Sequence, residues 1–258
     1  MAGWVIRGLS QPSRFWVANC GARERALSKG FFVTGTDTSA GKTHVSGELM
    51  TFLAAEGMRI GAMKPVASGG SWVLGEWRNE DALYLASLAS VNLPYEWVNP
   101  YAFREPIAPH LAARQEGQQI RLERIRGQFQ KIEAEVDGVV VEGAGGWLCP
   151  LGEGVDVADL AADLGLPVIL VVAIRLGCIN HARLTDEAIR SAKVPYAGWV
   201  ANFIDPEFTA SDETMETLAE FLGQRPLGTI GFRDGNPGVD QHRNNHWNRG
   251  EILRRMLP

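Results

Sequence analysis

Short apolar runs alternate with amphipathic stretches along this chain, and that alternation limits the possible folds more than any other feature. The apolar runs are residues 31–34, 59–66, 138–142, 167–174, 197–202 and 227–232. They are too short for helices, and several are apolar throughout, which is typical of strands buried on both faces of a parallel sheet. The amphipathic stretches lie near residues 42–56, 79–89, 121–135, 156–164, 180–192 and 211–222 and predict helices. The pattern predicts a single-domain, doubly wound α/β fold, with a mostly parallel sheet flanked by helices.

The two ends of the chain differ from this middle part. Residues 1–29 carry five basic side chains against one acidic one, and they predict a loosely ordered basic extension, with a transit peptide as the less favoured alternative. Residues 30–232 make up the predicted domain. Residues 233–258 are rich in turn-forming residues and predict a solvated C-terminal tail with one short helix near Ile252.

Composition narrows the range of partners. A net charge of −5 gives no general attraction for nucleic acid or for an anionic membrane surface. The longest apolar run, residues 167–174, is far shorter than the roughly 20 residues of a membrane span. The three cysteines, Cys20, Cys149 and Cys178, are too scattered for a disulfide framework or a zinc cluster. We therefore expect a cytoplasmic protein with small-molecule substrates and with neither nucleic acid nor membrane as a partner.

The strongest local motif is the glycine-rich segment Gly35-Thr-Asp-Thr-Ser-Ala-Gly41-Lys42-Thr43. It lies between a predicted strand and a predicted helix, where backbone N–H groups and the positive end of the helix dipole favour an anion. Lys42 would reach the β- and γ-phosphates of a nucleotide, and the Thr43 hydroxyl would coordinate Mg²⁺. Five residues rather than four separate the two glycines, but the context on both sides favours a phosphate loop.

Charged side chains at the ends of other predicted elements extend this site. Glu142 ends a predicted strand, and ligands of open α/β sheets bind at the carboxyl ends of strands. Asp81, at a helix start, either ligates Mg²⁺ or complements the helix dipole. Lys64 ends the second predicted strand and either stabilises a transferring phosphoryl group or reaches solvent. The proline-rich stretch 97–116 predicts a long substrate loop.

Taken together, the motifs resemble those of the dethiobiotin synthetase family. The matching segments are residues 34–43, 64–69, 99–101, 109–110, 115–117, 141–146, 176–181 and 197–202. They follow the family's order, and a five-residue spacing between the loop glycines is the rule in that family. The resemblance implies a fold of the P-loop NTPase type and a homodimer. It implies a cyclo-ligase that uses ATP and Mg²⁺ to convert 7,8-diaminopelargonate and CO₂ to dethiobiotin, ADP and phosphate, through a carbamate and a carbamic-phosphoric anhydride.

The same resemblance implies roles for individual residues. Lys42, Thr43 and Lys64 match catalytic positions, and Thr43, Asp81 and Glu142 match the Mg²⁺ ligands. The implied nucleotide contacts are Thr38, Ser39, Ala40, Gly41, Lys42, Thr43, His44, Glu142, Gly143, Ala144, Gly145, Asn202 and Phe232. The implied substrate contacts are Ser68 and the turn of Gly177, Cys178, Ile179 and Asn180, which would receive the substrate carboxylate across a dimer interface.

Several features leave alternatives open. Gly231 stands where the family often has proline near the purine, and Ser39 stands where it often has an acid. Cys178 is expected to be a structural thiol rather than a nucleophile. The alternative function is a nucleotide-switch ATPase of the partition or division-site class. Those proteins usually carry a lysine at the position of Asp37, which argues against this alternative.

Overall fold

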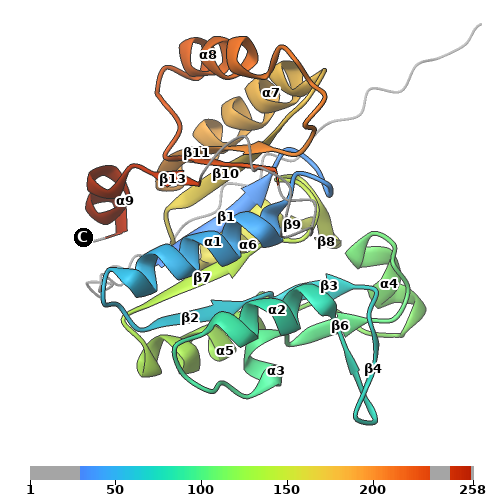
Figure 1. The fold of residues 1–258 in the computed structure, drawn as a ribbon. Helices are drawn as coiled ribbons and strands as arrows, with labels where there is room; N and C mark the ends of the chain where they lie inside the picture. The colour runs from blue at the N-terminus through green and yellow to red at the C-terminus, as the bar shows by residue number, and fades with distance from the viewer. Residues whose placement is uncertain (1–29, 233–244, 257–258) are drawn as a thin grey trace, which may run out of the picture.

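A seven-stranded sheet forms the centre of the computed structural model, which describes residues 30–232 and 245–256 (Figure 1). Its strands, in spatial order, are β13 (His246–Trp247), β12 (Gly228–Ile230), β11 (Tyr196–Phe203), β10 (Val168–Ile174), β1 (Gly30–Gly35), β7 (Gly138–Glu142) and β2 (Ile60–Met63). Every neighbouring pair is parallel except β12 and β13. The predicted mostly parallel sheet is confirmed, while the expected extension at residues 1–29 lies outside the described residues.

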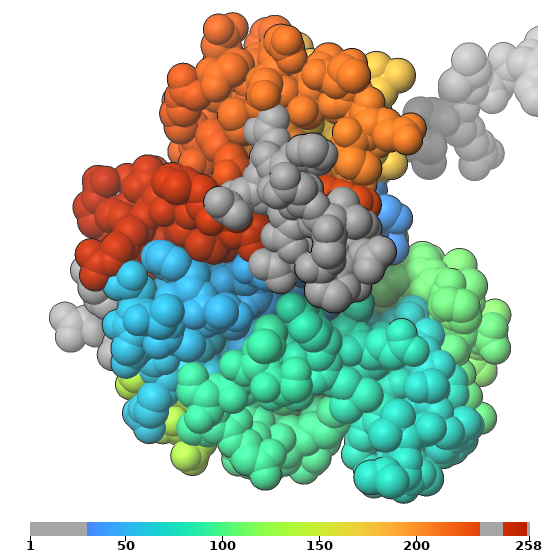
Figure 2. Space-filling view, in the orientation of Figure 1, coloured from blue at the N-terminus to red at the C-terminus, as the bar shows by residue number. Residues whose placement is uncertain are grey.

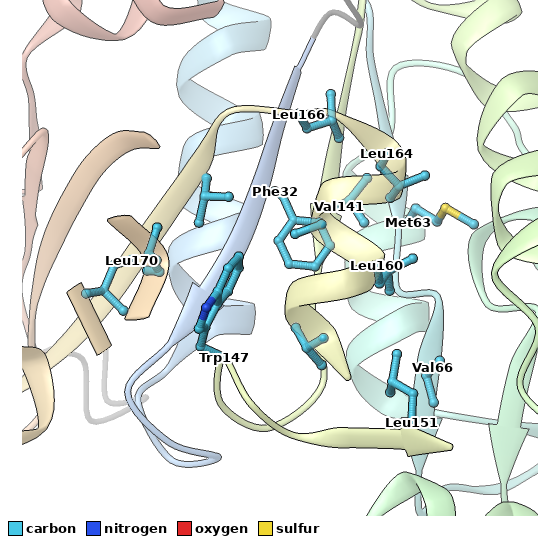
Figure 3. Close-up of a cluster of buried hydrophobic side chains, with 14 of the residues drawn as sticks. Phe32, Met63, Val66, Val141, Trp147, Leu151, Leu160, Leu164, Leu166 and Leu170 are labelled. Atoms are coloured by element: carbon cyan, nitrogen blue, oxygen red, sulfur yellow. The ribbon is translucent and has the colours of Figure 1, made fainter. Parts of the chain in front are cut away.

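Helices cover both faces of this sheet because its strands are apolar on both sides. The helices are α1 (Lys42–Ala55), α2 (Glu80–Leu88), α3 (Tyr95–Val98), α4 (Pro109–Gln115), α5 (Leu122–Glu135), α6 (Val157–Leu164), α7 (Cys178–Ser191), α8 (Ser211–Leu222) and α9 (Arg249–Met256). In β1, Phe31 and Val33 belong to the hydrophobic cluster shared with α1, α2 and α9, whereas Phe32 belongs to the cluster shared with α5 to α8. Figure 3 shows Phe32 and Val141 in this second cluster with Leu160 of α6. The doubly wound arrangement is confirmed.

Three small sheets lie outside the main one, and they mark where the predicted boundaries fail. They pair β3 (Val66–Ser68) with β6 (Tyr101–Phe103), β4 (Ser71–Val73) with β5 (Glu76–Arg78), and β8 (Pro150–Gly152) with β9 (Val155–Asp156). The single strand expected over residues 59–66 is interrupted at Lys64-Pro65, where proline lacks the N–H that a ladder needs. The stretch 97–116 is not a continuous loop, because it contains β6 and α4.

Within the described residues, no helix is long and apolar enough to cross a membrane.

The expectation of a solvated tail is wrong for the described C-terminal residues 245–256. β13 extends the sheet antiparallel to β12, and α9 is the short helix predicted near Ile252. Ile252 and Met256 are buried in the cluster around α1, and the Trp247 ring packs against Phe52 with 5.9 Å between centroids. Figure 2 shows the surface of α9 lying directly against that of α1. The C-terminal segment therefore completes one face of the core.

A substitution at Gly228 can test how closely β13 packs on β12. A Cβ at this glycine would lie 2.4 Å from the Trp247 ring and 2.8 Å from the backbone oxygen of His246. We expect Gly228→Ala to lower the free energy of unfolding by about 1 to 3 kcal/mol, the usual cost of overpacking a core. Gly250→Ala is the control, because a Cβ there meets nothing within 4 Å and alanine favours a helix. Denaturant unfolding of both variants checks this, and equal stabilities would contradict the tight contact.

Candidate active site

The segment between β1 and α1 has the geometry of a phosphate loop. Gly41 precedes α1 with a φ of 81°, and a Cβ there would lie 2.1 Å from Nδ2 of Asn202, so only glycine suits this position. The start of α1 has no side-chain cap hydrogen bond, and the N-terminus of a helix favours an anion. The loop closes around Lys42, whose Nζ donates to the carbonyl oxygens of Asp37 at 2.8 Å and Thr38 at 3.4 Å.

The electrostatics of the loop favour an anionic ligand. Lys42 is buried, and burial together with the nearby Lys64 ammonium lowers the pKa of Lys42 to about 8. Burial disfavours the charged form of Lys42, and together with the Lys64 charge it outweighs the carboxylates of Glu142, Asp37 and Asp81, so the pKa falls. A phosphate placed beside both ammonium groups would supply further negative charge.

Four predicted site residues come together around Lys64, which lies between β2 and β3. Its Nζ pairs with Oε1 of Glu142, at the end of β7, and lies 3.4 Å from Oδ2 of Asp81 in the first turn of α2. Thr43, in the first turn of α1, donates its hydroxyl to the same Glu142 oxygen at 2.9 Å. Burial alone would lower the pKa of Lys64, but the carboxylates of Glu142 and Asp81 outweigh it and raise that pKa.

The oxygen atoms of this cluster suit a Mg²⁺ ion that is coordinated partly by the protein and partly by a bound ligand. The described residues contain no group of three or more His, Cys, Asp or Glu side chains placed to bind a metal, so a protein-only metal cage is absent there. Glu142 is fully buried, and its Oε2 makes no hydrogen bond. Together with the Thr43 hydroxyl and the half-exposed Asp81 carboxylate, it forms the hard oxygen set with which proteins hold Mg²⁺ against substrate phosphates. The residues therefore fit the ion.

A pocket of about 240 Å³ adjoins the start of α1 on the side of β11 and β12. It is lined by Gly41, His44, Asn202, Phe203, Ile204, Gly231 and Phe232. Asn202, near the end of β11, donates its Nδ2 to the backbone oxygen of Ala40 at 2.9 Å. The predicted nucleotide contacts Gly41, His44, Asn202 and Phe232 thus meet in one hollow next to the phosphate loop.

A second cavity, of about 430 Å³, lies beside Lys64. It is lined by Thr38, Lys64, Val66, Ala67, Ser68, Asn79, Asp81, Pro106, Ile107, Ala108, Pro109, Ala144, Gly145 and Cys149. The Ser68 hydroxyl is buried there without a hydrogen bond, so a ligand in the cavity could supply its partner. The predicted loop 97–116 contributes only residues 106–109 to this lining. Ala144 and Gly145, expected at the nucleotide, line this cavity, whereas the Gly143 N–H donates to Val33 within the sheet.

Sequence reasoning missed the amide of Asn79 and the thiol of Cys149, which both line this cavity. Asn79 caps α2 by accepting the Ala82 N–H, and it donates to the Gly69 oxygen. Its cap position two residues before Asp81 was the available signal. Cys149 follows the small residues after β7, and burial raises the pKa of its thiol. No spacing pattern in the sequence marks Cys149, because it reaches the cavity only through the folding of the adjacent hairpin of β8 and β9.

The turn before α7 lies apart from this cavity. Gly177 caps α7 with a φ of 90°, and none of residues 177–180 lines the cavity. Burial raises the pKa of the Cys178 thiol, which keeps it protonated and supports a structural role. Arg175, just before the turn, pairs with Asp37 of the phosphate loop at 2.6 Å. The turn is therefore tied to the loop through Arg175 but contributes no residue to the lining of the cavity.

A parallel sheet whose first strand leads through a glycine loop into a lysine-bearing helix defines a P-loop nucleotide-binding protein. The family model described as "AAA domain" matches residues 29–235. The ATP-dependent dethiobiotin synthetase BioD of Aromatoleum aromaticum is 46% identical over 202 residues, which cover 78% of this chain and 90% of that protein. The protein of the same name from Xanthomonas axonopodis pv. citri is 45% identical over 211 residues, covering 82% of this chain and 94% of that protein. This chain belongs to the dethiobiotin synthetase family.

Structural similarity reaches more distant proteins as well. A ParA family ATPase from Chlorobium tepidum TLS aligns with a TM-score of 0.48 and 13% identity, covering 81% of this chain and 86% of that one. This relation is distant and says nothing about activity.

The pairing of Lys64 with Glu142 predicts strongly coupled stability effects. Lys64→Met or Glu142→Gln alone leaves an uncompensated buried charge, and each should lower the free energy of unfolding by about 3 kcal/mol. The double variant should lose less stability than the sum of the two single losses, and the difference should be about 1 kcal/mol or more. The control is the exposed pair of Arg59 and Asp137. Arg59→Met and Asp137→Asn should each lower the free energy of unfolding by less than about 1 kcal/mol, and the two losses should be additive. Denaturant unfolding measures both cycles, and additive losses at Lys64 and Glu142 would contradict the buried pair.

Proposed function

We propose that this chain is an ATP-dependent dethiobiotin synthetase that closes the ureido ring of dethiobiotin from 7,8-diaminopelargonate and CO₂. One observation carries the proposal: Lys64 contacts both Glu142 and Asp81 where the phosphate loop meets the 430 Å³ cavity. A nucleotide and a second, smaller substrate bound in these two spaces would meet at that lysine. ATP is the co-substrate in this proposal, with ADP and phosphate as products.

The phosphate loop binds the triphosphate in this proposal. Thr38, Ser39 and Ala40 offer backbone N–H groups beside the start of α1, and Lys42 exchanges its loop carbonyl partners for phosphate oxygens. The 240 Å³ pocket takes the adenine, with the Asn202 amide as its polar contact and His44 and Phe232 beside it. The support is that the pocket and the loop share Gly41, so one nucleotide can occupy both.

Mg²⁺ is proposed to be held by Thr43, Asp81 and Glu142. When bound, the ion neutralises phosphate charge and orients the terminal phosphoryl group. The buried Oε2 of Glu142, which lacks a hydrogen bond, supports this assignment.

The reaction requires positioning more than acid–base catalysis. A neutral amine of the diamine adds to CO₂, forming a carbamate and releasing a proton. A carbamate oxygen attacks the γ-phosphorus, and the bond to ADP breaks. The second amine then attacks the carbamoyl carbon, loses a proton, closes the ring and expels phosphate. Lys42 and Lys64 offset the negative charge of the triphosphate and carbamate, while Ser68 and the apolar residues 106–109 hold the diamine.

The active unit is proposed to be a cytoplasmic homodimer. The turn at residues 177–180 presents a helix N-terminus, which suits the substrate carboxylate, yet none of its residues lines the cavity of the same protomer. A second copy would bring such a turn to the cavity. Leu176 and Leu184, which flank the turn, are 89% and 61% exposed and offer apolar surface for that contact.

The test is phosphate release by the purified full chain with ATP, Mg²⁺ and bicarbonate, with and without 7,8-diaminopelargonate. We expect phosphate only when the diamine is present, with one dethiobiotin formed per phosphate by mass spectrometry. A mono-amine analogue serves as the control, because it forms a carbamate but cannot close the ring. Phosphate release at the same rate without the diamine would instead identify an ATPase.

Two lysine variants should separate nucleotide binding from catalysis. Lys42→Ala should abolish turnover and weaken ATP binding, because Lys42 faces the phosphates throughout. Lys64→Ala should reduce kcat by about 100-fold or more while changing ATP affinity less. The reason is that the Lys64 ammonium stabilises the negative charge that develops during phosphoryl transfer. Steady-state kinetics and calorimetric ATP titration measure both effects, and Lys193→Ala is the surface control. Full activity of Lys42→Ala would refute the phosphate-loop assignment, and an unchanged kcat of Lys64→Ala would refute that of Lys64.

A further inference from the structure

The C-terminal strap, which we define as residues 245–256, contacts α1 at regularly spaced positions. Asn245 Nδ2 donates to Glu48 Oε2 at 2.6 Å, Trp247 packs on Phe52, and Arg249 pairs with Glu56 at 2.6 Å. Glu48 and Phe52 of α1 and its C-cap residue Glu56 are four apart and form one stripe, whereas the strap residues are two apart along the segment in which β13 leads into α9. The strap therefore lies along the same helix whose first turn carries Lys42 and Thr43.

Asn245 makes a second contact that the packing of the strap does not require. Its Oδ1 accepts the backbone N–H of Gly231 at 3.1 Å. Gly231 lines the 240 Å³ pocket, and Glu48, the other partner of Asn245, comes one helical turn after His44, which also lines it. A single amide thus links α1 to the segment directly after β12, and both contribute residues to the pocket.

We infer that Asn245 is a positioning residue for the nucleobase and that the C-terminal strap tunes affinity for the nucleoside part of ATP. This rests on the proposed function insofar as the pocket receives the base of ATP. Glycine is the most flexible residue type, so the backbone at Gly231 would otherwise be mobile at the rim of the pocket. Because Asn245 holds this backbone before the ligand binds, less conformational entropy is lost on binding. Among the described residues, Asn245 forms its hydrogen bonds with Gly231 and Glu48 and none with the phosphate loop, so phosphate binding should not depend on it.

The experiment compares two ligands on each variant of the full chain. Calorimetry with Mg²⁺ measures the affinity for ATP and for inorganic tripolyphosphate, which fills the loop but not the pocket. We expect Asn245→Ala to weaken ATP by about three- to tenfold, the value of one or two hydrogen bonds, and to leave tripolyphosphate unchanged. In turnover, KM for ATP should rise while kcat and KM for the diamine stay constant. Asn248→Ala is the matched control, because Asn248 lies in the same strap and its side chain caps α9 by accepting the Glu251 N–H.

The ratio of the two affinities keeps the test valid if the variant is partly unfolded. An unfolded fraction lowers both apparent affinities equally, so their ratio reports the pocket alone. An unchanged ratio in Asn245→Ala, or an equal change in Asn248→Ala, would overturn the inference. Because the titration needs no turnover, a chain that binds ATP but makes no dethiobiotin would refute the proposed function and leave this inference standing.

Discussion

The pairing of the Lys64 ammonium with Glu142 inside the protein is the interaction on which the rest of the site depends. Glu142 is wholly buried and Lys64 nearly so, and neither charge would be tolerated there without the other. The two residues end neighbouring parallel strands, β2 and β7. Thr43 and Asp81, on the helices α1 and α2, complete their contacts. The charges therefore fix two helices against the edge of the sheet where the reaction is proposed to occur.

Local pattern was enough to predict the parts of the fold that repeat. The apolar runs located β1, β7 and β10, and the glycine spacing located the phosphate loop. The meeting of Lys64 with Glu142 could also be anticipated, since carboxyl ends of parallel strands share one edge. β13 could not be predicted, because a two-residue strand has no periodicity and exists only through contact with β12 and α1. The same holds for Cys149, which a small hairpin carries to the cavity.

Helix α1 links the two halves of the proposed ligand site. Its first turn borders the phosphate loop and, through Thr43, the Lys64 cluster. The outer side of α1 at Glu48 and Phe52, together with its C-cap residue Glu56, is covered by the C-terminal strap, which also reaches the rim of the 240 Å³ pocket. A segment whose composition suggests a tail thus supports the helix on which nucleotide binding depends. Composition reports how polar a segment is, whereas its contacts decide whether it is ordered.

The ion pair between Asp37 and Arg175 extends this linkage to the turn before α7. Asp37 lies in the phosphate loop and accepts Lys42 through its backbone oxygen, while its carboxylate is bound by Arg175 at the end of β10. The turn that begins α7 follows directly, so its position is tied to the loop by one charged contact. In the proposed dimer, this turn would bind a substrate carboxylate in the partner's cavity. The pair would then join the nucleotide loop of one protomer to the substrate of the other, a connection that a single protomer could not make.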